Sequence, residues 1–148
     1  MAKFIYKMQN ILDVKYKLEE QAKTRYSEAR VRLDVEQEKL EGLRNRKLMY
    51  EDMARELMCG ILNLARIRHV RQEIERIKEE IKNQLIQIRV SEKNLEQARL
   101  TLNEVIVARK THEKLKEDAF EEFRKELNSQ ESRENDELVS YSYSNRNS

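Results

Sequence analysis

Proline is absent from all 148 residues of the chain, and glycine occurs only twice, at Gly42 and Gly60. These two residue types interrupt helices most strongly, so little in the composition breaks a helix over long stretches. Tryptophan is also absent and aromatic residues make up 6% of the chain, whereas charged residues make up 39%. This balance is typical of long helices and excludes an ordinary core with an enclosed substrate pocket.

Residues with catalytic or metal-binding chemistry are equally scarce. Cys59 is the only cysteine, so no disulfide can form within the chain, and a reducing compartment is the natural setting. The two histidines, His69 and His112, would lie about 65 Å apart on one straight helix. No phosphate-binding glycine loop or other motif with a known mechanism appears. We therefore predict that the chain is not an enzyme and binds neither a cofactor nor a metal.

Long hydrophobic runs are missing as well. The longest stretch without a charged residue covers residues 57–65, whereas a membrane span needs about 20 apolar residues. Residues 1–7 lack the apolar core of a signal peptide. From these features we expect a cytoplasmic protein with no direct membrane insertion.

What the sequence does contain is a heptad repeat. Aliphatic residues recur at every seventh position of the second half, at Ile67, Ile74, Ile81, Ile88, Leu95 and Leu102. The positions three residues further on are Val70, Ile77, Gln84, Ser91, Ala98 and Val105. This spacing keeps one stripe of a helix against a partner helix, as in a coiled coil. A weaker stripe in the first half starts at Phe4, Met8, Ile11, Leu18 and Ala22, and resumes at Tyr26 after what we interpret as a stutter.

The two stripes meet at Gly60, where glycine can end one helix and Asn63 can cap the next. The predicted fold is therefore all-α, a long antiparallel two-helix coiled-coil hairpin over residues 1–132. Its arms are expected at about 2–58 and 64–132, followed by a flexible tail at 133–148 whose polar composition favours disorder. If facing positions sum to about 122, Phe4 meets Phe120 at the open end, where Lys15 is expected to meet Arg109 or His112.

Charge is unevenly distributed along this hairpin. Residues 42–71 contain seven Lys or Arg against three Asp or Glu, whereas residues 110–139 contain six against ten. The predicted tip is basic and the far part of the second arm is acidic. Such asymmetry can orient an elongated protein between two partners, although solvated helix faces with uneven counts explain it equally well.

Two short segments resemble a known family. Residues 4–15 (FIYKMQNILDVK), followed by the acidic stretch from Glu19 to Ala22, look like the start of the FliJ family of flagellar type III export proteins. Residues 136–143 (DELVSYSY) are similar to the family's acidic-Leu-x-Ser-aromatic-x-aromatic terminus. The Ser/Asn-rich extension after Tyr143 departs from the pattern, since many relatives end in basic residues.

The resemblance implies a non-catalytic central stalk of the flagellar export apparatus, located in the cytoplasm and peripheral to the membrane. Its implied partners are the hexameric export ATPase, the cytoplasmic domain of the export gate and export chaperones, with no nucleic acid. The residues expected at the ATPase contact surround the paired ends: Lys3, Phe4, Lys7, Gln9, Lys17, Phe120 and Arg124. The residues expected at the gate contact lie toward the tip: Tyr50, Met53, Leu57, Val70 and Ile77.

Three alternatives stay open from the residues alone. The tip stripe can be the continuation of the coiled-coil seam instead of a docking face. The whole chain can be a generic coiled-coil adaptor or tether unrelated to secretion. It can also be a rod that binds membrane surfaces or nucleic acid through the basic stretch at residues 44–71.

Overall fold

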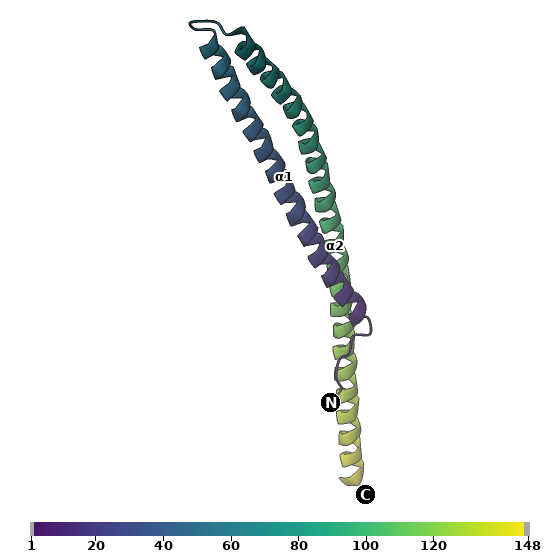
Figure 1. Ribbon diagram of the computed structural model, residues 1–148. Helices are drawn as coiled ribbons and strands as arrows, with labels where there is room; N and C mark the ends of the chain where they lie inside the picture. The colour runs from purple at the N-terminus through teal and green to yellow at the C-terminus, as the bar shows by residue number, and fades with distance from the viewer. Residues whose placement is uncertain (1, 147–148) are drawn as a thin grey trace. The chain divides into compact units, whose positions relative to one another are not determined.

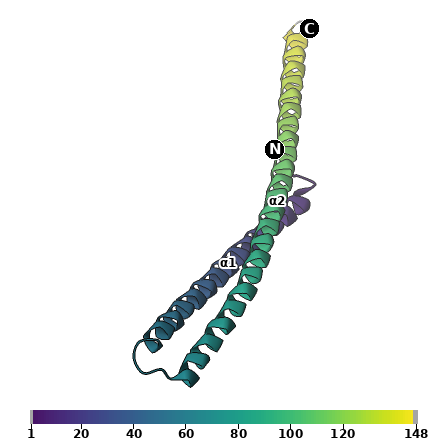
Figure 2. The ribbon, with the colours of Figure 1, turned by 90° about the horizontal axis from the view of Figure 1, so that it is seen from above.

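The computed structural model describes residues 2–146, which form two long helices. Helix α1 (Gln9–Leu57) has 49 residues and helix α2 (Leu64–Arg146) has 83. The helices run antiparallel and are joined by one short turn, and no strand occurs among the described residues (Figures 1 and 2). The predicted all-α antiparallel hairpin is thereby confirmed.

The turn lies where the sequence predicted it. Gly60 has a φ of +101°, a left-handed conformation that glycine adopts at little cost and that commonly ends a helix. At the end of α1 the Met58 N–H donates to the carbonyl of Arg55 over 3.2 Å. At the start of α2 the side chain of Asn63 accepts a 3.2 Å hydrogen bond from the Arg66 N–H, which caps the helix. One glycine and one asparagine thus account for the reversal of the chain.

The hairpin divides into two compact units, which are described one at a time. The tip unit comprises residues 21–103, and the terminal unit comprises residues 2–20 together with 104–146. Each unit contains a part of both helices. Each therefore has its own length of inter-helix seam, by which we mean the line of side chains buried between α1 and α2.

In the tip unit, the predicted heptad of α2 forms the buried face. Val70 and Ile77 are each only 1% exposed, and Ile88 and Ser91 are also buried. On the α1 side, Ala22 and Leu40 are buried, Tyr26, Ala29, Leu33 and Leu43 are half-buried, and Leu48, which was predicted on the stripe, is 56% exposed. The heptad register read from the second half of the sequence is therefore confirmed.

The stutter predicted in α1 is absent. The buried residues Leu12, Glu19 and Ala22 follow heptad steps that continue without interruption into the tip unit. Ile11 and Leu18, which were predicted on the seam, are 41% and 40% exposed. The prediction failed because it placed apolar residues on the seam wherever possible, whereas Glu19 occupies a buried seam position.

A second buried carboxylate, Glu36, lies on the seam of the tip unit. The Gln84 side-chain amide donates to the Glu36 carboxylate over 2.6 Å and to its backbone carbonyl over 2.8 Å. Arg32 and Lys39 pair with the same carboxylate at 3.0 and 3.6 Å. The hydrogen bond from Gln84 lowers the pKa of Glu36 below its ordinary value. A fully satisfied polar pair of this kind favours one alignment of the two helices over a shifted one.

Both outer helix boundaries differ from the predicted ones. Helix α1 begins at Gln9 instead of near residue 2, because residues 2–6 run extended along α2 before the chain turns into the helix. Helix α2 does not end near residue 132, and the predicted flexible tail is helical as far as Arg146. The segment contains no proline or glycine to end the helix, although all its described side chains are exposed. Residues 147–148 lie outside the described part.

Replacement of Ile77 by aspartate tests the seam. Because Ile77 is 1% exposed, Ile77→Asp places a carboxylate among apolar side chains, at a cost of several kcal/mol. We expect the thermal midpoint, followed by circular dichroism, to fall by about 10 °C or more. The matched control is Ile86→Asp, because Ile86 lies on the same helix but is 51% exposed, and it should change the midpoint little. Equal melting of both variants would contradict this seam.

Candidate interaction surfaces

The N-terminal segment is held against α2 by aromatic rings in the terminal unit. The ring of Phe4 lies 5.2 Å from that of Phe120 in an edge-on arrangement, with an interplanar angle of 76°. It also lies 5.5 Å from the ring of Phe123. We call these three residues the terminal aromatic layer. Aromatic pairs at such distances add about 0.5–1.5 kcal/mol beyond the burial of their area. The predicted contact between Phe4 and Phe120 is confirmed.

The extended N-terminal segment explains how Phe4 reaches this layer. Heptad steps counted back from Leu12 arrive at Met8 and Ile5, so a longer α1 would have turned Phe4 away from the seam. An extended chain also advances about 3.3 Å per residue against 1.5 Å in a helix, so Phe4 lies further along α2. Ile5 is 77% exposed as a result.

The polar residues predicted around this layer lie in the same unit. Lys3, Lys7 and Lys17 are exposed, and none of them pairs with an acidic group among residues 2–146. Gln9 is half-buried and donates a 2.9 Å hydrogen bond to Asp13. The ammonium groups of the three lysines are therefore the polar groups here that are most available to a partner. Arg124 is exposed and pairs at 3.1 Å with a glutamate one turn before it on α2.

A shallow hollow adjoins the terminal aromatic layer. Its volume is about 320 Å³, and its lining includes Phe4, Leu12, Tyr16 and Phe120. Phe120 is 43% exposed, so part of an aromatic ring is accessible from solvent. An apolar side chain of another protein can contact these rings without any separation of the two helices.

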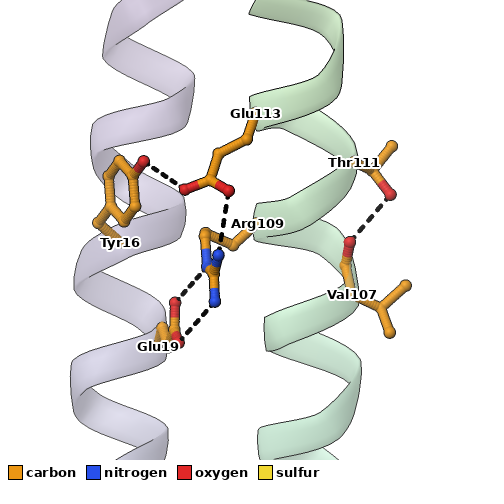
Figure 3. Close-up of polar contacts among 6 residues, drawn as sticks. All are labelled: Tyr16, Glu19, Val107, Arg109, Thr111 and Glu113. Atoms are coloured by element: carbon orange, nitrogen blue, oxygen red, sulfur yellow. Dashed lines mark hydrogen bonds and ion pairs between the residues drawn. The ribbon is translucent and has the colours of Figure 1, made fainter. Parts of the chain in front are cut away.

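A network of four polar residues crosses the terminal unit (Figure 3), and we call it the polar layer. The Arg109 guanidinium of α2 donates two hydrogen bonds to the Glu19 carboxylate of α1, at 2.7 and 3.2 Å. It donates a third to Glu113 at 3.0 Å. Glu113 also accepts a 2.5 Å hydrogen bond from the hydroxyl of Tyr16. The two-point contact between Arg109 and Glu19 fixes direction as well as distance.

The pKa values in the polar layer shift in the directions that this geometry requires. The hydrogen bonds from Tyr16 and then Arg109 hold the pKa of Glu113 below its ordinary value of 4.5. The bonds to Glu19 and Glu113 raise the pKa of Arg109. The bond to Glu113 raises the pKa of the Tyr16 hydroxyl. These shifts favour a charged Glu113 and Arg109 and a neutral Tyr16 hydroxyl, which are the forms that make the hydrogen bonds of the layer.

Sequence reasoning missed the polar layer. Arg109 was expected to face Lys15, but it pairs with Glu19. In this part of the hairpin, each residue of α1 therefore faces a residue further along α2 than the predicted register placed it. A signal was present, since Arg109 follows Leu102 by one heptad and Glu19 follows Leu12 in the same way. Opposite charges at seam positions of both arms indicate a paired layer.

The tip residues proposed as a second contact lie mainly on the seam. Tyr50, Met53 and Leu57 are half-buried. Val70 and Ile77 are each 1% exposed, so they are packed between the helices and present no surface to a partner. The burial of this group favours the interpretation of the stripe as a continuation of the seam.

Two further chemical possibilities receive no support from the described residues. Within residues 2–146, His, Cys, Asp and Glu side chains nowhere gather in a group of three or more that could hold a metal ion. Over the same residues, neither helix contains a stretch that is long and apolar enough to cross a membrane.

Comparison with known proteins gives one sequence match and one structural match. The model of the family described as "Flagellar FliJ protein" matches residues 4–148. Among curated proteins, none matches the sequence. A solved structure of a putative YscO homolog from Chlamydia trachomatis resembles the fold with a TM-score of 0.71 and 23% sequence identity. The alignment covers 93% of this chain and 94% of that one, so the fold is similar over nearly the whole length.

Replacement of Arg109, whose guanidinium joins the two carboxylates, tests the polar layer. Arg109→Gln leaves the buried Glu19 without its two-point partner, so we expect a clear fall in the thermal midpoint at pH 7. Arg99→Gln is the matched control, because Arg99 pairs with Glu96 on the exposed surface of the same helix, where ion pairs contribute little. If both variants melt alike, the polar layer does not stabilise the hairpin.

Acid should weaken the hairpin. The pKa values of Glu36 and Glu113 are lower in the folded chain than their ordinary 4.5, so the stability that they contribute is complete above that value. It is lost as the pH falls through the lowered values. We expect the thermal midpoint to drop between about pH 5 and 3, and to drop less in the Glu36→Gln/Glu113→Gln variant.

The matched control for the acid experiment is Glu79→Gln/Glu92→Gln, which alters two exposed glutamates of α2. This variant should keep the full acid dependence of the unaltered chain. A drop of the same size in all three proteins would show that Glu36 and Glu113 do not carry the effect.

Proposed function

The chain belongs to the flagellar FliJ family, and from this premise we propose that it is a non-catalytic stalk that binds the hexameric export ATPase. Membership makes it a component of the flagellar type III secretion machinery. The proposal adds that the stalk couples ATP hydrolysis to protein export. It acts from the cytoplasm, at the periphery of the membrane-bound export apparatus.

The terminal unit is the proposed ATPase contact, and the observation that carries this step is the terminal aromatic layer. Phe4 packs on Phe120 and Phe123 and so holds the N-terminal segment against α2. Lys3 and Lys7 flank Phe4 and are exposed without an acidic partner in the described chain. A partner therefore meets an aromatic surface with adjacent positive charge, a combination that favours protein binding.

The polar layer supports this role mechanically. A stalk must transmit motion or strain between partners, which requires that its two helices do not slide past each other. The two hydrogen bonds from Arg109 to Glu19 hold α1 and α2 in one alignment within the terminal unit. A shift of one helix would separate these groups and break both hydrogen bonds between the guanidinium and a buried carboxylate, which is costly.

The proposed stalk acts on hydrolysis only through its partner. A bound protein can shift a conformational equilibrium by the difference between its affinities for the two states. Tighter binding to the hydrolysis-competent ring would raise ATPase activity without any catalytic residue in this chain. The proposal therefore assigns no catalytic role to the residues of the terminal unit.

The other partners belong to the same proposal in a narrower form. Contact with the export gate stays a prediction for Tyr50, Met53 and Leu57, whose side chains are partly accessible. Val70 and Ile77 are left out of it because they are buried between the helices. Binding of export chaperones follows only from the family resemblance and has no assigned surface here.

Charge reversal beside the terminal aromatic layer tests the ATPase contact. Lys3→Glu/Lys7→Glu changes two exposed side chains that pack against nothing essential, so the hairpin should melt as before. We expect the concentration of the chain that gives half-maximal stimulation of the cognate export ATPase to rise roughly tenfold.

Lys82→Glu/Lys93→Glu is the matched control, with the same change of charge on exposed lysines of α2 in the tip unit. It should leave stimulation unaltered. Equal effects of the two variants would move the contact away from the terminal unit. If the unaltered chain does not stimulate the ATPase at all, the alternative of a generic coiled-coil adaptor or tether would be favoured instead.

A further inference from the structure

The turn of the hairpin is unusually apolar for an exposed loop. We call residues 58–64 the tip loop. Four of its side chains are aliphatic and exposed: Met58 is 57% exposed, Ile61 100%, Leu62 55% and Leu64 71%. These residues belong to the uncharged stretch at 57–65. Exposed apolar side chains that cluster on a surface commonly mark a site of interaction.

The hairpin itself does not require these four side chains. Gly60 supplies the left-handed conformation of the turn, and Asn63 caps α2. The buried part of the seam resumes only with Ile67 and Val70. Polar residues would serve an exposed turn at least as well. The aliphatic character of the tip loop therefore has no explanation in folding.

Positive charge surrounds the tip loop. Residues 55–71 contain four arginines and one glutamate. Arg66, Arg68 and Arg71 are exposed, and none of the three pairs with a carboxylate among residues 2–146. Arg68 and Arg71 line a surface hollow of about 480 Å³ together with Leu64. Cationic and aliphatic groups thus share one surface at the start of α2.

We propose that the tip loop docks on an anionic lipid bilayer, with its aliphatic side chains in the headgroup region and its arginines on lipid phosphates. Charge complementarity carries the choice of partner, since an anionic membrane surface attracts clustered arginines over about a Debye length. Apolar side chains that enter the interface add to this attraction. The prediction of no direct membrane insertion rested on the lack of a segment long enough to span a bilayer, and docking in the headgroup region needs no such segment.

Other partners fit the tip loop less well. Nucleic acid would engage the arginines but would leave the exposed aliphatic side chains of the loop without an apolar surface to contact. An acidic protein groove would require a definite shape and hydrogen bonds, whereas the Asn63 side chain is already engaged in the helix cap. A bilayer accepts aliphatic side chains without a matching pocket. The inference goes beyond the proposed function and does not depend on the ATPase contact.

Co-sedimentation of the full chain with vesicles tests the inference. We expect binding to vesicles of phosphatidylglycerol and phosphatidylethanolamine, little binding to phosphatidylcholine alone, and a decline with added salt. Ile61→Asn/Leu62→Asn should lower the partition coefficient at least tenfold. Arg66→Gln/Arg68→Gln should also lower it, by roughly five-fold for each arginine. Neither variant alters the seam.

Val31→Asn is the matched control, because Val31 is 61% exposed on α1 within the same unit, and it should bind as the unaltered chain does. A polarity-sensitive dye on Cys59, the sole cysteine and an exposed residue of the tip loop, should report an apolar environment on binding. The proposal is wrong if anionic vesicles do not bind the chain, or if they bind the loop variant equally well. Loss of DNA or export-gate binding in the loop variant, with vesicle binding unchanged, would assign the loop to that partner instead.

Discussion

A pair of helices buries only one narrow stripe on each, and the rest of this structure depends on how that stripe is filled. Six apolar side chains are buried in the described chain: Leu12, Ala22, Leu40, Val70, Ile77 and Ile88. Most other residues face solvent whatever their chemistry. Stability is therefore distributed along the seam in small contributions, and no single cluster acts as a core. Each seam position counts, and a polar residue there must have a partner.

The polar seam positions determine alignment more than they determine stability. A purely aliphatic seam can slide by one heptad with little loss, because one aliphatic layer packs much like the next. Glu36 with Gln84 and Glu19 with Arg109 cannot slide, since each would lose its hydrogen bonds inside the seam. One such pair lies in each unit. The alignment of the helices is thus specified independently in both parts of the hairpin.

The sequence predicted the fold well where periodicity was strong. The heptad of α2 from Ile67 to Val105, the turn at Gly60 and the cap at Asn63 all followed from spacing and backbone chemistry. The seam of α1 was less predictable because Lys15 and Glu19 occupy seam positions and Ile11 and Leu18 do not. Local hydropathy cannot indicate that a buried glutamate is acceptable, since the arginine that makes it so is far away in sequence.

The outer boundaries were predicted least well, for the same physical reason. Whether residues 2–8 are helical depends on a distant contact, the packing of Phe4 on Phe120 and Phe123. The candidate site was predictable in part: the pairing of Phe4 with Phe120 followed from an antiparallel register, whereas the polar layer required the correct register in detail. The polar composition of residues 133–146 suggested a disordered tail, but α2 continues to Arg146. A polar composition indicates that a segment has no apolar face to pack, and it does not indicate where a helix ends.

Each of the two units exposes side chains that the seam does not need for folding. In the tip unit, aliphatic side chains on the turn and arginines beside it contribute nothing to the seam. In the terminal unit, exposed lysines flank an aromatic layer whose outer edge is accessible. Since side chains outside the seam can change without unfolding the hairpin, these two surfaces are where partner binding can be specified. A protein built in this way can bind a different partner through each of the two units while its helices stay paired.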